Sequence, residues 1–371
     1  MKKVLALVLA LTLVVGLFSF AAADEAKKKV GIAMPTKALE RWNSDGDFLK
    51  KAFEEAGYEV EMTYSDNKAD QQVNDIQGLL ADGVDLLIIT AVDGQSLNTV
   101  MDEAQEKGVI VVAYDRLIMH DAVSYYVSYD NYTVGTLQGQ FVEEALGLKD
   151  AGDKKFNIEI TGGDPADNNA PFFYQGAIDV LTPYIEAGTV VVPSGQIAFD
   201  QVGTASWDEA NALDRAQAIL GSYYGDGLQL DAWVCSNDST SRGVVQALSQ
   251  DYKGDNAVIV TGQDADDVNL VNIYEGKQTM TVYKNLANEV AITLAVAKAA
   301  LEGEIDGEAL AKSFEIQVAF DTESYETTPG HKCPSFLLVP YVITKDTMQL
   351  LVDTGLYAWN ADNTFVQKVP D

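Results

Sequence analysis

Several apolar runs of this sequence end in charged, carboxamide and aromatic side chains. The clearest cases are residues 35–37 with Arg41 and Trp42, and residues 113–116, 162–169, 236–238, 262–266 and 283–285. Asp, Asn, Arg and Lys can hold a hydroxyl group, which donates and accepts hydrogen bonds, and bonds to ionised groups are roughly twice as strong as neutral ones. The indole and phenyl rings of Trp42, Phe172, Phe173 and Trp207 suit the C–H face of a sugar ring. These residue types predict a site for a small polar ligand.

Each of these features also has a structural explanation when it is taken alone. Helix caps, a surface ion pair or a core position would account for Asp115, Arg116, Asn168, Asn169, Asp264, Asp266, Trp42 and Trp207. We favour a shared site because several such groups fall at the same edge of the sheets that the sequence predicts.

Signals for catalysis, metals and disulfides are weak. The sequence has no Gly-x-Ser-x-Gly elbow, His-Glu-x-x-His motif or phosphate-binding loop. Two carboxylates could flank a glycosidic bond, but adjacent Lys and Arg would keep both ionised. Residues 264–267 lack the twelve-residue calcium-loop pattern. We therefore predict no catalytic residue, no metal ligand and no cofactor. Cys235 and Cys333 could pair, although Cys235 closes an apolar strand and fits a buried thiol better.

Strand-like and helical patterns alternate along the chain. Residues 86–89 and 109–113 are continuously apolar, as parallel strands covered on both faces should be. We expect strands at 29–34, 59–64, 85–90, 109–114, 156–161, 189–192, 231–235, 257–261 and 279–282, and helices at 43–56, 70–82, 96–107, 132–146, 170–186, 207–224, 240–249, 267–275 and 286–301. This order predicts an α/β fold of two doubly wound parallel-sheet lobes. Ligands of such sheets bind beyond the carboxyl ends of the strands.

The composition and the N-terminus indicate a compartment. Asp and Glu number 56 against 25 Lys and Arg, a net charge of −31, which argues against nucleic-acid and membrane-surface partners. Lys2 and Lys3, an apolar run over 4–20 and three alanines before Asp24 predict a signal peptide over residues 1–23. An uncleaved anchor is the alternative. No later segment is apolar and long enough to span a bilayer, so we expect a protein that is free in a periplasm or secreted, without stable membrane insertion after cleavage.

The strand-end segments resemble the periplasmic sugar-binding proteins of ABC importers, cluster B, and most closely the multiple-monosaccharide and xylose-binding receptors. The matching segments are GIAMPTK (31–37) with Arg41 and Trp42, AYDRLI (113–118), FNIE (156–159), GGDPADNNAPFF (162–173), SGQ (194–196) with Trp207 and Asp208, GQDA (262–265) and TMTVYK (279–284). Asn237-Asp238 and TMTVYK lean toward the xylose type, whereas FNIE and GGDPADNNAPFF lean toward the multiple-sugar type.

The resemblance implies a type I binding protein with three interlobe crossings, near residues 128–131, 284–285 and 336–341. One lobe would comprise 24–129 plus 285–337, and the other 130–284 plus 338–371. Matching positions imply ligand-binding roles for Lys37, Arg41, Trp42, Asp115, Arg116, Asn168, Asn169, Trp207, Asn237, Asp264 and Lys284.

The function that the resemblance implies is capture of a free aldose, such as xylose or glucose, and its delivery to an ABC permease. A chemosensory receptor is a second candidate partner. The alternatives are a receptor for another small polar ligand, such as a furanose-type autoinducer, and a secreted sugar-processing enzyme. A sugar-responsive repressor would need a DNA-reading head where the signal peptide stands, and its charge would have the opposite sign.

Overall fold

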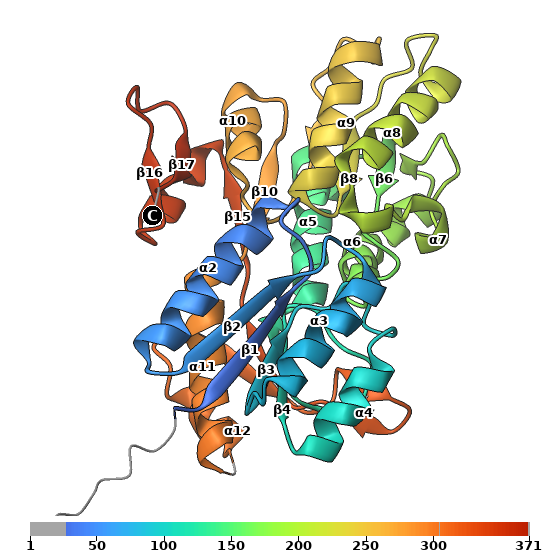
Figure 1. Cartoon of the computed structure of the whole chain (residues 1–371). Coiled ribbons are helices and arrows are strands. Elements are labelled where there is room, and N and C mark those ends of the chain that lie inside the picture. Colours follow the sequence, from blue (N-terminus) through green and yellow to red (C-terminus); the bar gives the residue numbers. More distant parts are fainter. Residues whose placement is uncertain (1–26, 304, 370–371) are drawn as a thin grey trace, which may run out of the picture.

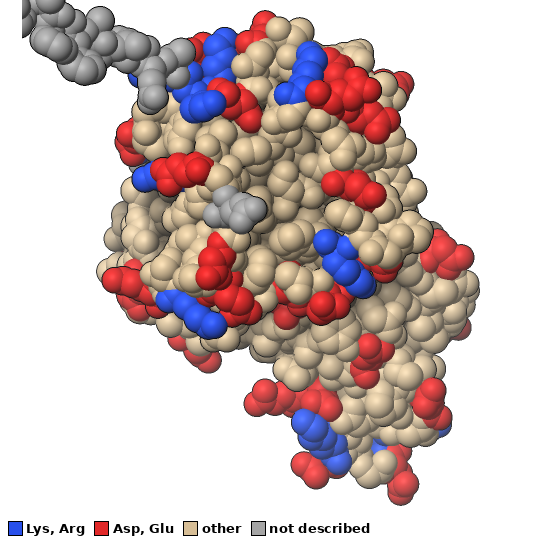
Figure 2. Space-filling view, turned by 90° about the horizontal axis from the view of Figure 1, so that it is seen from below, with Lys and Arg blue, Asp and Glu red and all other residues tan. Residues whose placement is uncertain are grey.

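The computed structural model describes residues 27–303 and 305–369 (Figure 1). The expected signal peptide over residues 1–23 lies outside this range. Acidic side chains outnumber basic ones on the face seen in Figure 2, in agreement with the sign of the net charge, −31.

The first lobe is built on a seven-stranded sheet of order β11-β14-β5-β4-β3-β1-β2. Its neighbouring strands run parallel except for β11, which pairs antiparallel with β14. The strands are β1 (Lys29–Met34), β2 (Glu59–Tyr64), β3 (Leu86–Ile89), β4 (Ile110–Tyr114), β5 (Val123–Tyr129), β11 (Val318–Asp321) and β14 (Ser335–Leu338).

Helices cover both faces of this sheet. Leu86 and Ile88 of β3 pack with α2 (Glu40–Glu55) and α11 (Leu286–Glu302), whereas Leu87 and Ile89 pack with α3 (Ala69–Ala81) and α4 (Asn98–Lys107). Successive side chains of a strand point to opposite faces, so a strand buried on both sides must be apolar throughout. This explains the unbroken run at 86–89.

The second lobe repeats the arrangement with a four-stranded parallel sheet of order β7-β6-β8-β9. Its strands are β6 (Phe156–Thr161), β7 (Val190–Val191), β8 (Ala232–Cys235) and β9 (Ile259–Val260). α5 (Asn131–Leu146) and α6 (Ala170–Glu186) contribute to one core, and α8 (Glu209–Tyr223) and α9 (Asp238–Asp251) to another. The remaining elements there are α7 (Phe199–Val202), α10 (Asp267–Glu275), α13 (Gln349–Val352), and the antiparallel pairs β10 (Met280–Tyr283) with β15 (Tyr341–Thr344) and β16 (Tyr357–Trp359) with β17 (Val366–Lys368).

The chain passes between the lobes three times, after β5, after β10 and after β14. Helices begin directly beyond the first two crossings, where the side chains of Asp130 and Asn285 accept hydrogen bonds from the backbone N–H groups of Thr133 and Ala287. The predicted fold class is confirmed: two doubly wound lobes are joined by three crossovers. In the first lobe α12 (Gly307–Lys312), β12 (Glu326–Thr328) and β13 (His331–Lys332) complete the fold. No helix of the described residues is both long and apolar enough to cross a bilayer.

Candidate functional site

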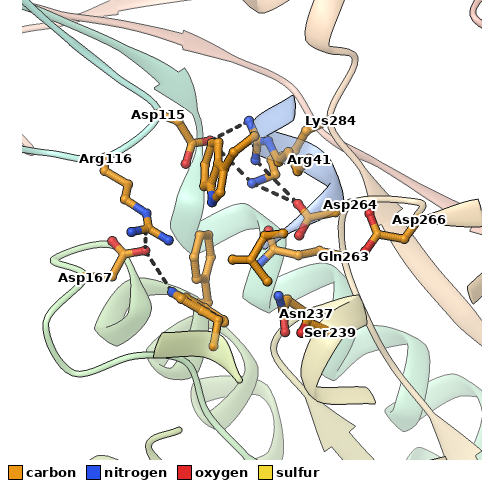
Figure 3. A pocket seen from close by; sticks show the side chains of 14 residues that line it. Arg41, Asp115, Arg116, Asp167, Asn237, Ser239, Gln263, Asp264, Asp266 and Lys284 are labelled. Atoms are coloured by element: carbon orange, nitrogen blue, oxygen red, sulfur yellow. Dashed lines mark hydrogen bonds and ion pairs between the residues drawn. The ribbon is translucent and has the colours of Figure 1, made fainter. Parts of the chain in front are cut away.

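A cavity lies between the lobes at the carboxyl ends of their strands (Figure 3). About 430 Å³ of space between its lining residues is not filled by protein atoms, part of it open to solvent. The lining residues are Leu39, Arg41, Trp42, Asp115 and Arg116 from the first lobe, Asp167, Phe173, Trp207, Asn237, Ser239, Gln263, Asp264 and Asp266 from the second, and Lys284 from the crossing after β10.

The loops that carry these residues hold unusual backbone conformations. Asp115 follows β4 with φ 58°, Trp207 has φ 54°, and Asp264 and Ala265 follow β9 with φ 105° and 54°. Positive φ costs of order 1–3 kcal/mol for a non-glycine residue and persists where surrounding contacts enforce it, as at ligand clamps. Contacts within the structure therefore hold these loops in place.

Arg41, in the first turn of α2, is the centre of the charged network. Its guanidinium nitrogens lie 2.7 Å from Asp115, 2.8 Å from Glu289 and 3.4 Å from Asp264. Asp45, one turn along α2, approaches it at 3.5 Å and accepts a 2.5 Å hydrogen bond from Tyr114. Because Asp264 belongs to the second lobe, this one side chain connects both walls of the cavity.

The network keeps Arg41 and Asp115 ionised, whereas burial raises the pKa of Glu289 well above its ordinary value. Burial lowers the pKa of Arg41, but four surrounding carboxylates, led by Asp115, raise it well above its ordinary value. Burial raises the pKa of Asp115, yet Arg41, Lys284 and Arg116 bring it below its ordinary value. Lys284 lies 3.4 Å from Asp115 and 3.3 Å from Asp264. Asp115 is therefore a fixed anionic acceptor flanked by cationic donors.

A second polar group stands on the opposite side of the cavity. Asp167 lies 3.1 Å from Nε of Arg116 and accepts a 3.2 Å hydrogen bond from the indole of Trp207. Asn237 caps α9, since its Oδ1 accepts from the backbone N–H of Thr240 at 2.9 Å. The cap holds the Asn237 side chain against the cavity and leaves its amide nitrogen for a ligand.

Aromatic rings line the same cavity. The guanidinium groups of Arg41 and Arg116 lie over the Trp42 ring, 4.9 and 5.0 Å from its centroid. Trp207 meets Phe173 edge-on at 6.1 Å. These contacts hold the rings beside the charged groups, so the cavity offers flat apolar faces and directed hydrogen bonds together.

Some polar atoms of the lining have no partner among the described residues. They are Nε1 of Trp42, Oε1 of Gln263 and Oδ1 of Asp266, all buried. An unpaired buried donor or acceptor costs about 1–3 kcal/mol. A ligand that both accepts from Trp42 and donates to Gln263 and Asp266 would remove this cost.

The structure brings eight of the eleven predicted site residues to the cavity: Arg41, Trp42, Asp115, Arg116, Trp207, Asn237, Asp264 and Lys284. The other three do not line it. Lys37 is exposed over the ring of Tyr64, and Asn168 donates to the backbone carbonyl of Leu117 at 3.3 Å. Asn169 is buried between the lobes and donates to the carbonyl of Asp115.

Six lining residues are not among the eleven predicted site residues, although the ring of Phe173 was named as suited to a sugar face. Asp167 and Phe173 lie in the 162–173 segment, and Gln263 and Asp266 in the 262–266 segment, so their neighbourhood was a usable signal. Nothing in the sequence around Leu39 or Ser239 indicated that these residues would line a cavity. Glu289 and Asp45, which support Arg41, sit inside helices, and nothing in the sequence indicated that role.

Groups that could support other chemistry lie elsewhere. His120 is 3.2 Å from Asp102, and His331 lies in β13, both outside the cavity lining. Cys235 and Cys333 are buried and free, which confirms the buried thiol expected at Cys235. In the described ranges no group of three or more His, Cys, Asp or Glu side chains is arranged to hold a metal ion.

Two α/β lobes, three crossings and a polar cavity with aromatic walls at the strand ends define a type I solute-binding protein. The chain belongs to the periplasmic binding protein domain family, whose sequence model matches residues 30–305. Members of this family bind solutes.

Individual relatives cover most of the chain. It is 38% identical over 363 residues to the multiple sugar-binding periplasmic receptor ChvE of Rhizobium radiobacter, covering 96% of this chain and 98% of that one. It is 36% identical to the D-xylose-binding periplasmic protein of Escherichia coli, covering 76% and 83%. A solved ABC transporter solute binding protein from Clostridium phytofermentans with bound β-D-glucose is 44% identical with a TM-score of 0.83, covering 91% and 100%.

Proposed function

We propose that the protein is a periplasmic receptor that captures a free aldose between its lobes and delivers it to an ABC permease. The observation that carries the proposal is the joint placement of Asp115, Arg41 and Arg116 beside the rings of Trp42 and Trp207. Vicinal ring hydroxyls need ionised donors and acceptors at fixed positions, and the sugar's C–H face needs a flat ring. The binding named for the relatives supports the same ligand class.

The proposal includes the division of the chain. The first lobe comprises residues 24–129 plus 285–337 and the second 130–284 plus 338–371, after export directed by residues 1–23 and cleavage behind Ala23. A chemosensory receptor is a second partner in this proposal. The ligand contacts are the eight predicted residues that line the cavity, together with Asp167, Gln263 and Asp266. Asn168 and Asn169 serve the contact between the lobes.

Candidate sugars follow from the relatives. D-glucose is the sugar bound in the Clostridium phytofermentans protein, and D-xylose is the sugar named for the Escherichia coli protein. A pentose and a hexose share the ring hydroxyls that Asp115 and Arg116 can clamp, and they differ at the exocyclic carbon.

Native mass spectrometry of protein purified without added sugar tests the ligand class directly. A retained pentose or hexose, or a 1:1 complex on adding D-xylose or D-glucose, supports the proposal. Binding of an amino acid or nucleoside in place of either sugar contradicts it. Chromatography after incubation with aldoses and aryl glycosides tests the absence of turnover, because catalytic product would replace the receptor assignment with an enzyme.

A further inference from the structure

The C-terminal hairpin formed by β16 and β17 lies beside α10 (Figure 1). It falls outside residues 30–305, the range that the family's sequence model matches. Its two strands contact a ligand-site loop of their own lobe and a helix of the other lobe. The hairpin therefore connects the cavity to the boundary between the lobes.

Its first strand supports the strained loop at the end of β9. The buried hydroxyl of Tyr357 donates a 3.1 Å hydrogen bond to the backbone carbonyl of Ala265. Ala265 and its neighbour Asp264 both have positive φ, and Asp264 carries the carboxylate that faces Arg41. Because these conformations are unfavourable in isolation, a contact that holds the Ala265 carbonyl helps to set where Asp264 points.

Its second strand reaches the first lobe. Nζ of Lys368 lies 2.8 Å from Glu40, the first residue of α2, and the two side chains are 20% and 34% exposed. The backbone N–H of Lys368 also donates to Asp267 at 2.8 Å. Glu40 directly precedes Arg41, so this ion pair bridges the lobes next to the network that joins them inside the cavity.

We propose that Lys368 and Tyr357 are positioning residues for ligand capture: Lys368 favours the closed arrangement by pairing with Glu40, and Tyr357 fixes the loop of Asp264. A hinge motion that separates the lobes parts Lys368 from Glu40 and leaves the Tyr357 contact intact. Apparent affinity scales with the fraction of molecules in the binding-competent form, so a contact made only in that form raises affinity without touching the ligand. The tests of this inference that use a sugar rest on the proposed sugar-receptor function; the test without sugar does not.

The test compares dissociation of D-glucose and D-xylose by stopped-flow fluorescence in full-length mature protein. Lys368→Met and Glu40→Gln should each speed dissociation about two- to fivefold, the range expected for a partly exposed ion pair. Glu40 also accepts a 3.5 Å hydrogen bond from the backbone N–H of Asp267. The double variant should therefore be no faster than Glu40→Gln alone, because the Lys368 pair is lost in both. Added salt should speed dissociation from the wild type and have less effect on the variants. Tyr357→Phe should weaken binding without altering this salt dependence.

The matched control is Lys149→Met, which breaks a 2.8 Å ion pair with Glu143 inside the second lobe. Its dissociation rate should equal that of the wild type. Rates in the Lys368 and Glu40 variants that match this control, or additive effects in the double variant, overturn the proposal.

A measurement without sugar separates this inference from the proposed function. Nitroxide labels at Lys51→Cys on α2 and Gln246→Cys on α9 report the distance between the lobes, since the native cysteines are buried. Lys368→Met should shift the ligand-free distance distribution toward longer values, and Tyr357→Phe should not. If the wild type binds neither sugar, the proposed function fails, and the ligand-free distance distribution alone tests the role of Lys368. A shift in Lys368→Met supports that role, and an unchanged distribution overturns it.

Discussion

The side-chain amide of Asn169 donates a 2.5 Å hydrogen bond to the backbone carbonyl of Asp115, and the two residues belong to different lobes. The same carbonyl accepts from the hydroxyl groups of Tyr126 at 2.7 Å and Ser128 at 3.0 Å. These three donors hold Asp115 in its left-handed conformation. The position of the Asp115 carboxylate thus depends on a residue of the facing lobe.

Asn169→Ala should weaken aldose binding by about 1–3 kcal/mol, because it removes a buried hydrogen bond that fixes Asp115. Isothermal titration calorimetry measures the loss. Asn168→Ala is the matched comparison, since it removes a longer, 3.3 Å bond between the lobes at the carbonyl of Leu117. A loss as large in Asn168→Ala as in Asn169→Ala would mean that adhesion between the lobes, rather than placement of Asp115, is what matters.

Asp115→Ala should cost roughly 2–5 kcal/mol of binding, because Arg41 and Lys284 would remain buried with one of their carboxylate partners missing. Calorimetry with D-xylose and D-glucose checks this against Asp214→Ala, an exposed acidic residue of α8 outside the cavity lining. Unchanged affinity in the Asp115 variant would refute its role as the sugar clamp.

Gly163→Ala should damage the Trp207 wall of the cavity. A Cβ at this position would lie 2.0 to 2.5 Å from three carbons of the indole ring, so Trp207 must move. We expect a stability loss of about 1–3 kcal/mol and weaker sugar binding. At the adjacent Gly162 the nearest atom would be Cγ2 of Val202 at 3.2 Å, so Gly162→Ala is the control. Thermal melts and titrations that rank the two variants equally would contradict the prediction.

Sugar should close the lobes. A ligand that touches Arg41 and Asp115 on one side and Trp207 and Asn237 on the other binds the closed form better, and this difference drives closure. At a hundred times the dissociation constant the folded state should gain about 2.7 kcal/mol. The expected readouts are a higher melting temperature, a saturable tryptophan fluorescence change and a smaller radius of gyration in X-ray scattering. Amino acids and nucleosides serve as negative controls, and compaction by one of them alone would reject the assigned ligand class.

Asp266 should make folding stability fall as the pH rises. Burial, with the nearby Glu40 adding to it, raises the pKa of Asp266 from its ordinary 3.8 to about 6. The folded state therefore holds the proton more tightly than the unfolded state, and this stabilisation is present below about pH 3.8 and lost as the pH approaches about 6. Thermal melts across this window should show a smaller pH dependence in Asp266→Asn. An identical slope in both proteins would contradict the assignment.

Sequence patterns predicted most helices and strands between residues 29 and 302 because long apolar periodicities dominate there, but β5 and α7 were not among them. The short strands after residue 303 were not predicted, since two to four residues in a hairpin carry no measurable hydrophobic period. The position of the cavity could also be predicted from the strand ends, because the topology of a parallel sheet places the carboxyl ends of its strands at one edge.

Which side chain of a loop faces the cavity could not be predicted in the same way. Asp167 lines the cavity, whereas its neighbours Asn168 and Asn169 contact the other lobe. That choice depends on turn dihedrals, which the residue types leave open. The ion pair between Glu289 and Arg41 could not be predicted either, because it depends on the tertiary packing that places α11 beside α2.

The place of β14 in the first sheet decides how the chain can be divided. Ser335 pairs with Tyr126, and β14 lies between β5 and β11 rather than at an edge. The first sheet, which begins with Lys29, therefore cannot be completed until β14 has been synthesised, after every strand of the second sheet. Pairing between strands so far apart in the sequence is slow. Neither lobe can be produced as one contiguous fragment, and a chain that stops before Ser335 loses an inner strand of the first lobe together with its last crossing.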